Sequence, residues 1–174
     1  NKVQELDSKI SELGDIVNYH MIGSLQTNKV KNIIDKVKLI HSLDRLALAK
    51  ELDKRAKQKN IVIDTLIQVN VAKEETKSGF SVEEVIPFIE KAITLDNIKI
   101  RGLMTIAPNS EDTNLLRNVF RTLYELKEDI KGRNYKEVNM DFLSMGMTHD
   151  YEIAIEEGSN MIRVGTGIFG KRNY

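Results

Sequence analysis

The chain has 174 residues, no cysteine and no tryptophan, and its 26 basic residues balance its 26 acidic residues. This neutral charge argues against a nucleic-acid-binding protein, which normally carries a basic excess or patch. A hydrophobic content of 41% with 30% charged residues is typical of a globular domain that buries a substantial core. The lack of cysteine excludes disulfides and cysteine-based zinc or redox sites, and no apolar run approaches the roughly 18 residues that a membrane-spanning helix needs.

The first part of the chain alternates amphipathic stretches with short apolar runs. Apolar residues at helical spacing predict a helix over residues 1–13. The sequence therefore starts inside a helix and without a methionine, and we expect a further N-terminal segment to precede it. The next elements are expected in this order: strand 19–23, helix 28–36, strand 38–42 and helix 44–59. Asp44 directly follows an apolar run and is predicted as the N-cap of the last of these helices.

The second part of the chain continues the same alternation. The expected elements are strand 64–71, helix 81–95, strand 98–106, helix 112–131, strand 137–144, helix 149–157 and strand 161–165. Ser81 and Glu84 have the spacing of a capping box, and Gly132 is predicted as the C-cap of the long helix. Neither low-complexity segments nor linkers interrupt the pattern, so we expect one domain over residues 1–174.

Six strand–helix units predict an α/β fold with a parallel sheet. Two architectures fit: an open doubly wound sheet, or a (β/α)8 TIM barrel whose first two strands are absent from this chain. A closed barrel needs about eight strands, and the opening helix has no strand before it. Composition and periodicity alone leave both possibilities open.

Two glycine-containing loops follow the last two predicted strands and are candidates for ligand binding. They comprise residues 143–148 and 163–167. Glycine lets the backbone approach a ligand, while serine and threonine add hydroxyl donors. In (β/α)8 barrels a phosphate is often bound after strands 7 and 8, which would be the last two strands here. Tight turns are the alternative explanation, but two such loops at the expected pair of positions favour a phosphate site.

Polar residues interrupt several of the predicted apolar strands. Arg163 lies in a short apolar run, so it either faces the mouth of a barrel or points outward to a carboxylate. The other interrupting residues are His20, His41, Gln68, Asn70 and Arg101. A polar layer inside a barrel and buried structural hydrogen bonds explain these equally well. The histidines lack metal-ligand spacing, so we expect no metal site. Lys77, in the polar loop 73–79, is interpreted as a solvated residue.

Several motifs resemble, in order along the chain, those of the pyridoxal phosphate homeostasis protein family. They are His-Met-Ile-Gly-Ser-Leu-Gln-Thr-Asn-Lys at 20–29, His-Ser-Leu-Asp-Arg at 41–45, Leu-Ile-Gln-Val-Asn-Val at 66–71, Lys-Ser-Gly at 77–79, Arg-Gly-Leu-Met at 101–104, Leu-Ser-Met-Gly-Met at 143–147, and the ending from Arg163 to Gly170. The resemblance implies a (β/α)8 barrel of the alanine racemase N-terminal type that holds pyridoxal 5′-phosphate (PLP).

The resemblance also implies roles for individual residues. The family's Schiff-base lysine belongs to a segment upstream of Asn1, so no catalytic residue is assigned within this sequence. Asn1 would lie near the cofactor ring, and Arg163 would face the pyridine nitrogen. The implied phosphate site consists of Ser144, the backbone of Met145, Gly165 and Thr166.

The family resemblance implies a cytoplasmic, monomeric PLP carrier or buffer in vitamin B6 homeostasis, without established turnover. Its partners would be PLP and the PLP-dependent apo-enzymes that receive it, with neither nucleic acid nor membrane. An arginine disfavours a proton on the pyridine nitrogen, which weakens the ring as an electron sink and suits a carrier or racemase-like chemistry better than transamination. The alternatives are a PLP-dependent amino-acid racemase and a cofactor-free barrel enzyme acting on a phosphorylated metabolite.

Overall fold

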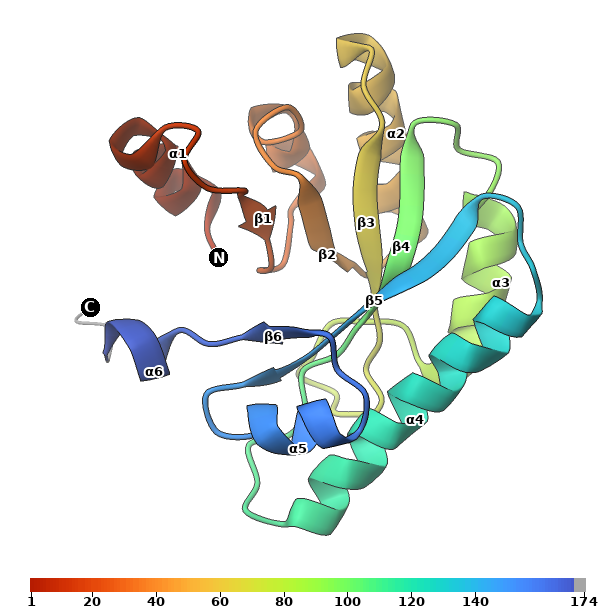
Figure 1. The fold of residues 1–174 in the computed structure, drawn as a ribbon. Helices are drawn as coiled ribbons and strands as arrows, with labels where there is room; N and C mark the ends of the chain where they lie inside the picture. The colour runs from red at the N-terminus through yellow and green to blue at the C-terminus, as the bar shows by residue number, and fades with distance from the viewer. Residues whose placement is uncertain (171–174) are drawn as a thin grey trace.

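The computed structural model describes residues 1–170 and contains one six-stranded sheet (Figure 1). The strands are β1 (His20–Met21), β2 (Leu39–Leu43), β3 (Ile63–Gln68), β4 (Ile98–Met104), β5 (Val138–Met147) and β6 (Met161–Arg163). Each strand pairs in parallel with the next one along the chain. A doubly wound sheet would reverse its strand order at a switch point, whereas this sequential order is that of a (β/α)8 barrel. Residues 171–174 of the predicted domain lie outside the described part.

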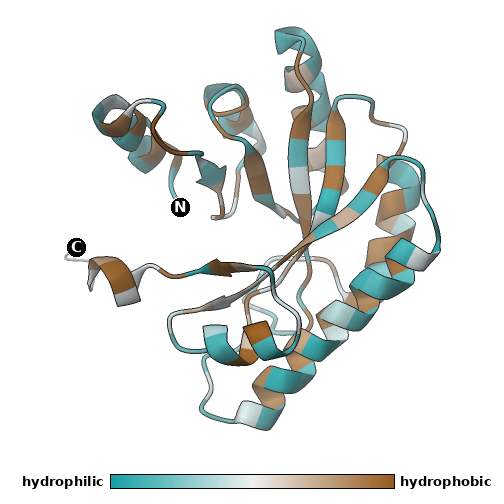
Figure 2. Ribbon diagram, in the orientation of Figure 1, coloured by the Kyte–Doolittle hydropathy of each residue, from teal (hydrophilic) through white to brown (hydrophobic). Residues whose placement is uncertain are grey.

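Helices flank the strands of the curled sheet (Figure 1). They are α1 (Val3–Leu13), the 3₁₀ helix η1 (Thr27–Asn32), α2 (Leu46–Lys59), α3 (Val82–Ala92), α4 (Thr113–Gly132), α5 (Tyr151–Glu156) and α6 (Thr166–Phe169). Helices α2, α3, α4 and α5 cover the outer side of the sheet, whereas the short α6 follows β6 and lines a cavity (Figure 1). The alternating brown and teal bands along α4 in Figure 2 reflect its amphipathic sequence, whose apolar residues are buried. Within residues 1–170, no helix has the length and hydropathy required to cross a membrane.

The sheet buries side chains on both of its faces. The large core between sheet and helices includes Leu43, Leu48 and Phe120, none of which is exposed. A separate small cluster contains Leu39, Leu66 and Met104. Because side chains alternate along a strand, His41 and Gln68 lie on the same face as the cluster residues two positions before them. This inner face therefore leads from an apolar layer to polar side chains at the carboxyl ends of the strands.

Several predictions of helix boundaries were wrong. Asp44 is not an N-cap: α2 begins after Arg45, whose guanidinium pairs with Asp44 and also donates to the Leu25 carbonyl oxygen at 2.8 Å. Gly132 is the last residue of α4 and Arg133 is its C-cap. The helix expected over residues 28–36 is the 3₁₀ helix η1, which ends at Asn32.

Other predictions of local structure agree with the observed elements or fall short by a few residues. The capping box of α3 forms, since the Ser81 N–H group donates to Glu84 Oε2 at 2.9 Å. Strand β5 runs three residues beyond its predicted end, because it pairs with β6 up to the contact of Met147 with Arg163. The short helix α6 was not expected.

Candidate functional site

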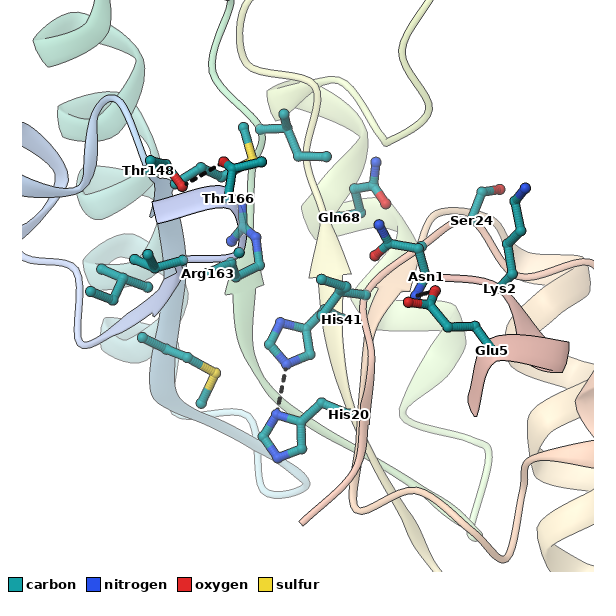
Figure 3. A pocket seen from close by; sticks show the side chains of 18 of the residues that line it. Asn1, Lys2, Glu5, His20, Ser24, His41, Gln68, Thr148, Arg163 and Thr166 are labelled. Atoms are coloured by element: carbon teal, nitrogen blue, oxygen red, sulfur yellow. Dashed lines mark hydrogen bonds and ion pairs between the residues drawn. The ribbon is translucent and has the colours of Figure 1, made fainter. Parts of the chain in front are cut away.

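A cavity of about 1510 Å³ opens at the carboxyl ends of the strands. Its lining includes residues from every strand or from the loop that follows: His20, His41, Gln68, Ile106, Thr148 and Arg163. The cavity mixes apolar walls with a small number of polar groups, as is typical of a small-molecule site. Figure 3 shows that Thr148, Thr166 and Arg163 lie on one side, and Asn1 and Ser24 on the other.

Two threonines mark the end of the cavity formed by the last two strands. Thr148 follows β5 and Thr166 begins α6, and their Oγ1 atoms are 3.1 Å apart. The Gly167 N–H group donates to Thr148 Oγ1 at 3.2 Å. Gly165 lines the cavity, and a Cβ built on it would meet no atom within 4 Å. Hydroxyls and an unobstructed backbone therefore lie side by side, which suits an oxyanion such as phosphate.

Arg163 ends β6 and brings a positive charge to this side of the cavity. Its Nη1 donates to Ser144 Oγ and its Nη2 to the Thr105 carbonyl oxygen, both at 2.8 Å. Burial lowers the pKa of Arg163 to about 10, and the nearby negative charge of Asp150 opposes that shift. The guanidinium thus remains charged at neutral pH, and it forms no ion pair with a carboxylate among the described residues.

Ser144 and Met145 lie beneath the cavity rather than in its lining. Both are fully buried. The Ser144 hydroxyl already contacts Arg163 and His41, and the Met145 carbonyl oxygen accepts a hydrogen bond from Ser159 Oγ at 2.8 Å. The phosphate roles expected for these two residues stay predictions. The lining offers Thr148 instead, the last residue of the glycine-containing loop 143–148 that the sequence indicated as a candidate for ligand binding.

Asn1 lines the opposite side of the cavity, where α1 approaches β1. Its backbone lies against Gly23, because a Cβ on Gly23 would come within 2.3 Å of the Asn1 carbonyl oxygen. Asn1 is thereby held at the cavity mouth, away from the two threonines.

His20 and His41 connect the two sides of the cavity. His20 Nδ1 lies 3.1 Å from His41 Nε2, and His41 Nδ1 lies 3.0 Å from Ser144 Oγ. Burial, followed by the charges of His20 and Arg163, lowers the pKa of His41 to about 3, so His41 is neutral at physiological pH. Burial also lowers the pKa of His20. No group of three potential metal ligands occurs within residues 1–170.

The remaining polar strand residues mainly support the architecture. Gln68 Nε2 donates to the Ser78 carbonyl oxygen at 2.8 Å, and Asn70 Nδ2 donates to the carbonyl oxygens of Glu74 and Lys77. Both amides therefore hold the loop that follows β3. Lys77 Nζ donates to the Ala107 carbonyl oxygen at 3.1 Å, so Lys77 is tied to the next loop rather than freely solvated.

Arg101 takes no part in the cavity. It forms ion pairs with Asp64 at 2.9 Å and with Asp141 at 2.7 Å, which links β3, β4 and β5. None of these three residues lines the cavity.

Comparisons with known proteins show which family this chain belongs to. Residues 10–173 match the family model described as the N-terminal domain of alanine racemase. The chain is 50% identical over its whole length to the pyridoxal phosphate homeostasis protein of Aquifex aeolicus, of which it covers 76%. It is 38% identical to the protein of the same name from Helicobacter pylori, over 97% of this chain and 74% of that protein. This chain belongs to the pyridoxal phosphate homeostasis protein family.

Solved structures confirm the fold expected for a pyridoxal phosphate homeostasis protein. PipY of Synechococcus elongatus without PLP superposes with a TM-score of 0.91 at 31% identity, over 98% of this chain and 80% of PipY. PipY with PLP bound gives a TM-score of 0.88 at 31% identity, over 98% of this chain and 79% of PipY. An alanine racemase from Clostridium difficile gives 0.77 at 15% identity, over 99% of this chain and 44% of that enzyme, which shows a shared fold.

Proposed function

We propose that this chain binds PLP in the cavity at the carboxyl ends of its strands. The observation that carries the proposal is the position of Arg163, a charged guanidinium without an ion-pair partner among the described residues, on the same side of the cavity as the hydroxyls of Thr148 and Thr166 (Figure 3). The homologous PipY, at 31% identity, has been solved with PLP bound, which supports the same ligand here.

The residues that line the cavity fit the chemical groups of PLP. Its phosphate would be held by Thr148, by Thr166 and by the backbone N–H groups of Gly165 and Thr166, where no side chain blocks the approach. Arg163 would face the pyridine nitrogen, and Asn1 would lie near the ring from the other side. Bound PLP supplies an electrophilic aldehyde on an electron-withdrawing ring.

Burial separates the roles of Ser144 and Thr148. A fully buried serine whose hydroxyl already contacts two side chains is poorly placed to reach a phosphate in the cavity. Thr148 lines the cavity, and its hydroxyl adjoins that of Thr166. We therefore assign the side-chain contact with phosphate to Thr148 and place Ser144, with the backbone of Met145, behind it.

The charge of Arg163 favours a carrier over an enzyme that needs a strong electron sink. A permanent cation beside the pyridine nitrogen opposes its protonation, and an unprotonated ring withdraws electrons less strongly. We propose that the protein acts in PLP homeostasis as a single PLP-binding domain, monomeric and cytoplasmic, that buffers the cofactor or delivers it to PLP-dependent apo-enzymes.

Equilibrium titration of the full-length protein with PLP and with pyridoxal tests the phosphate site. Thr148→Val and Thr166→Val should each weaken PLP binding by roughly tenfold, because each removes one hydrogen bond to a charged group. Pyridoxal lacks the phosphate, so its affinity should not change. Thr122→Val is the matched control, since within residues 1–170 the Thr122 hydroxyl bonds only to the Asn118 carbonyl oxygen of α4 and does not line the cavity. Wild-type PLP affinity in both cavity variants would refute the phosphate assignment.

A racemase assay distinguishes the carrier from an enzyme. The PLP-loaded protein is incubated with L-alanine, and the formation of D-alanine is followed with a chiral readout. A carrier should show no sustained turnover, whereas robust racemisation would contradict the carrier role without affecting the assignment of the binding site.

A further inference from the structure

Four side chains from four strands form a hydrogen-bonded row at the floor of the cavity. His20 of β1 contacts His41 of β2 at 3.1 Å, His41 contacts Ser144 of β5 at 3.0 Å, and Ser144 contacts Arg163 of β6 at 2.8 Å. Figure 3 shows the two imidazoles in line, with Arg163 above them. The row is buried at His41 and Ser144 and exposed at His20.

The direction in which the hydrogen bonds of the row are donated follows from Arg163 at its end. Arginine can only donate, so Ser144 Oγ accepts the hydrogen bond from Arg163 Nη1. The single hydroxyl proton of Ser144 then needs an acceptor, and within residues 1–170 His41 Nδ1 is the only further partner of that oxygen. His41 must therefore carry its proton on Nε2 and donate it to His20 Nδ1. A neutral His20 then accepts on Nδ1 and carries its own proton on Nε2.

The environment keeps His41 neutral, as this direction requires. Its exposed fraction is 1%, and the charged groups that act on it are His20 and Arg163, both of which disfavour a second proton. The pKa of His41 is accordingly lowered to about 3. A neutral imidazole can accept from Ser144 on one nitrogen and donate to His20 from the other.

We propose that His41 and Ser144 are positioning residues for Arg163, and that they hold its guanidinium at the cavity floor through a hydrogen-bonded row of fixed direction. The second anchor of Arg163 is the Thr105 carbonyl oxygen at 2.8 Å, so the two contacts together define the plane of the guanidinium. The effect on a bound cofactor rests on the proposed function. His41 and Ser144 would set how closely the Arg163 guanidinium faces the pyridine nitrogen of PLP.

Nitrogen-15 NMR of the histidine imidazoles in the cofactor-free protein tests the direction of the row. At pH 7 wild-type His41 should be neutral, with its proton on Nε2, and Ser144→Ala should shift both nitrogen resonances of His41. Ser42→Ala is the matched control. Ser42 follows His41 in β2 and is as fully buried as Ser144, but its hydroxyl has no hydrogen-bond partner among the described residues. A His41 that carries its proton on Nδ1, or a doubly protonated His41, would overturn the proposal.

Absorbance of bound PLP as a function of pH tests the positioning role. Ser144→Ala and His41→Leu should change this pH profile and weaken PLP binding by roughly threefold to tenfold, as expected for one lost hydrogen bond. His41→Asn should restore much of the wild-type profile, because its amide oxygen can replace Nδ1 as the acceptor. Ser42→Ala should match the wild type.

The two measurements separate the possible failures. Unchanged profiles in Ser144→Ala and His41→Leu, with PLP still bound, would contradict the positioning role alone. If the wild-type protein binds no PLP, the proposed function fails, and the NMR measurement still decides the direction of the row. If His41→Leu does not fold, the comparison of Ser144→Ala with Ser42→Ala remains decisive.

Discussion

At the scale of single residues, Arg163 gives the cavity its chemical character. Its contacts with Ser144 and Thr105 leave the guanidinium partly buried but charged. Burying a cation is costly unless hydrogen bonds and a suitable counter-group compensate. Within residues 1–170 the hydrogen bonds of the guanidinium go to neutral oxygens, and the negative charge of Asp150 acts on it without a direct ion pair, so the cavity floor favours a ligand that brings negative charge or a lone pair.

His41 should make the stability of the folded chain depend on pH. Burial, His20 and Arg163 lower its pKa from 6.5 to about 3. Below pH 6.5 the imidazole at this position is therefore protonated in the unfolded chain but stays neutral in the folded chain. The free energy of unfolding consequently falls as the pH falls. Between pH 6.5 and pH 5 the loss should be about 1–2 kcal/mol.

Urea unfolding at pH 7 and at pH 5 measures this effect in the wild type and in His41→Asn. The pH interval lies above the range where carboxylates titrate, so their contribution is small. The wild type should lose more stability than the variant over this interval. Equal losses in the two proteins would rule out a buried, neutral His41.

At the scale of elements, the close packing of β4 on β5 depends on a glycine. Gly102 has φ +152°, and a Cβ built there would lie 1.9 Å from the Phe142 carbonyl oxygen. The register between the two strands also shifts between Ile100 and Gly102. A side chain at this position would require the two backbones to separate.

Gly102→Ala should therefore destabilise the fold by more than about 2 kcal/mol, since the substitution combines backbone strain with a clash. Gly132→Ala provides the control. Gly132 lies in α4, a Cβ added to it would meet no atom within 4 Å, and the substitution should stabilise the fold by up to about 1 kcal/mol. Thermal or urea unfolding compares the two, and a mild effect of Gly102→Ala would contradict the observed approach of the strands.

The strands and helices also show which features of the fold could be predicted from the sequence and which could not. Apolar periodicity predicted the alternation of strands and helices, because it depends on which side chains are buried locally. The end of β5 depends on pairing with β6, and the start of α2 on the contact of Arg45 with Leu25, neither of which is local. The site shows the same limit: His41 and Ser144 are 103 residues apart, so their contact has no sequence signal. The motif of residues 143–148 indicated a segment that reaches the cavity, but only the tertiary structure shows that Thr148 lines the cavity and that Ser144 lies below it.

At the scale of the whole molecule, sequential parallel pairing brings the carboxyl ends of all six strands to one rim (Figure 1). The loops after β5 and β6 bring the phosphate-binding candidates there, and β1 and β2 bring the two histidines. The fold matches that of PipY over 98% of this chain, and the chain spans 76% of its Aquifex aeolicus relative. The site is thus assembled from segments spread along the entire chain.

A crystal structure of the full-length protein with PLP tests the central claim most directly. The PLP phosphate should lie about 3 Å from Thr148 Oγ1, from Thr166 and from the backbone N–H groups of Gly165 and Thr166, with Arg163 facing the pyridine nitrogen. A phosphate bound at Ser144, or a pyridine ring that lies away from Arg163, would contradict the proposed site.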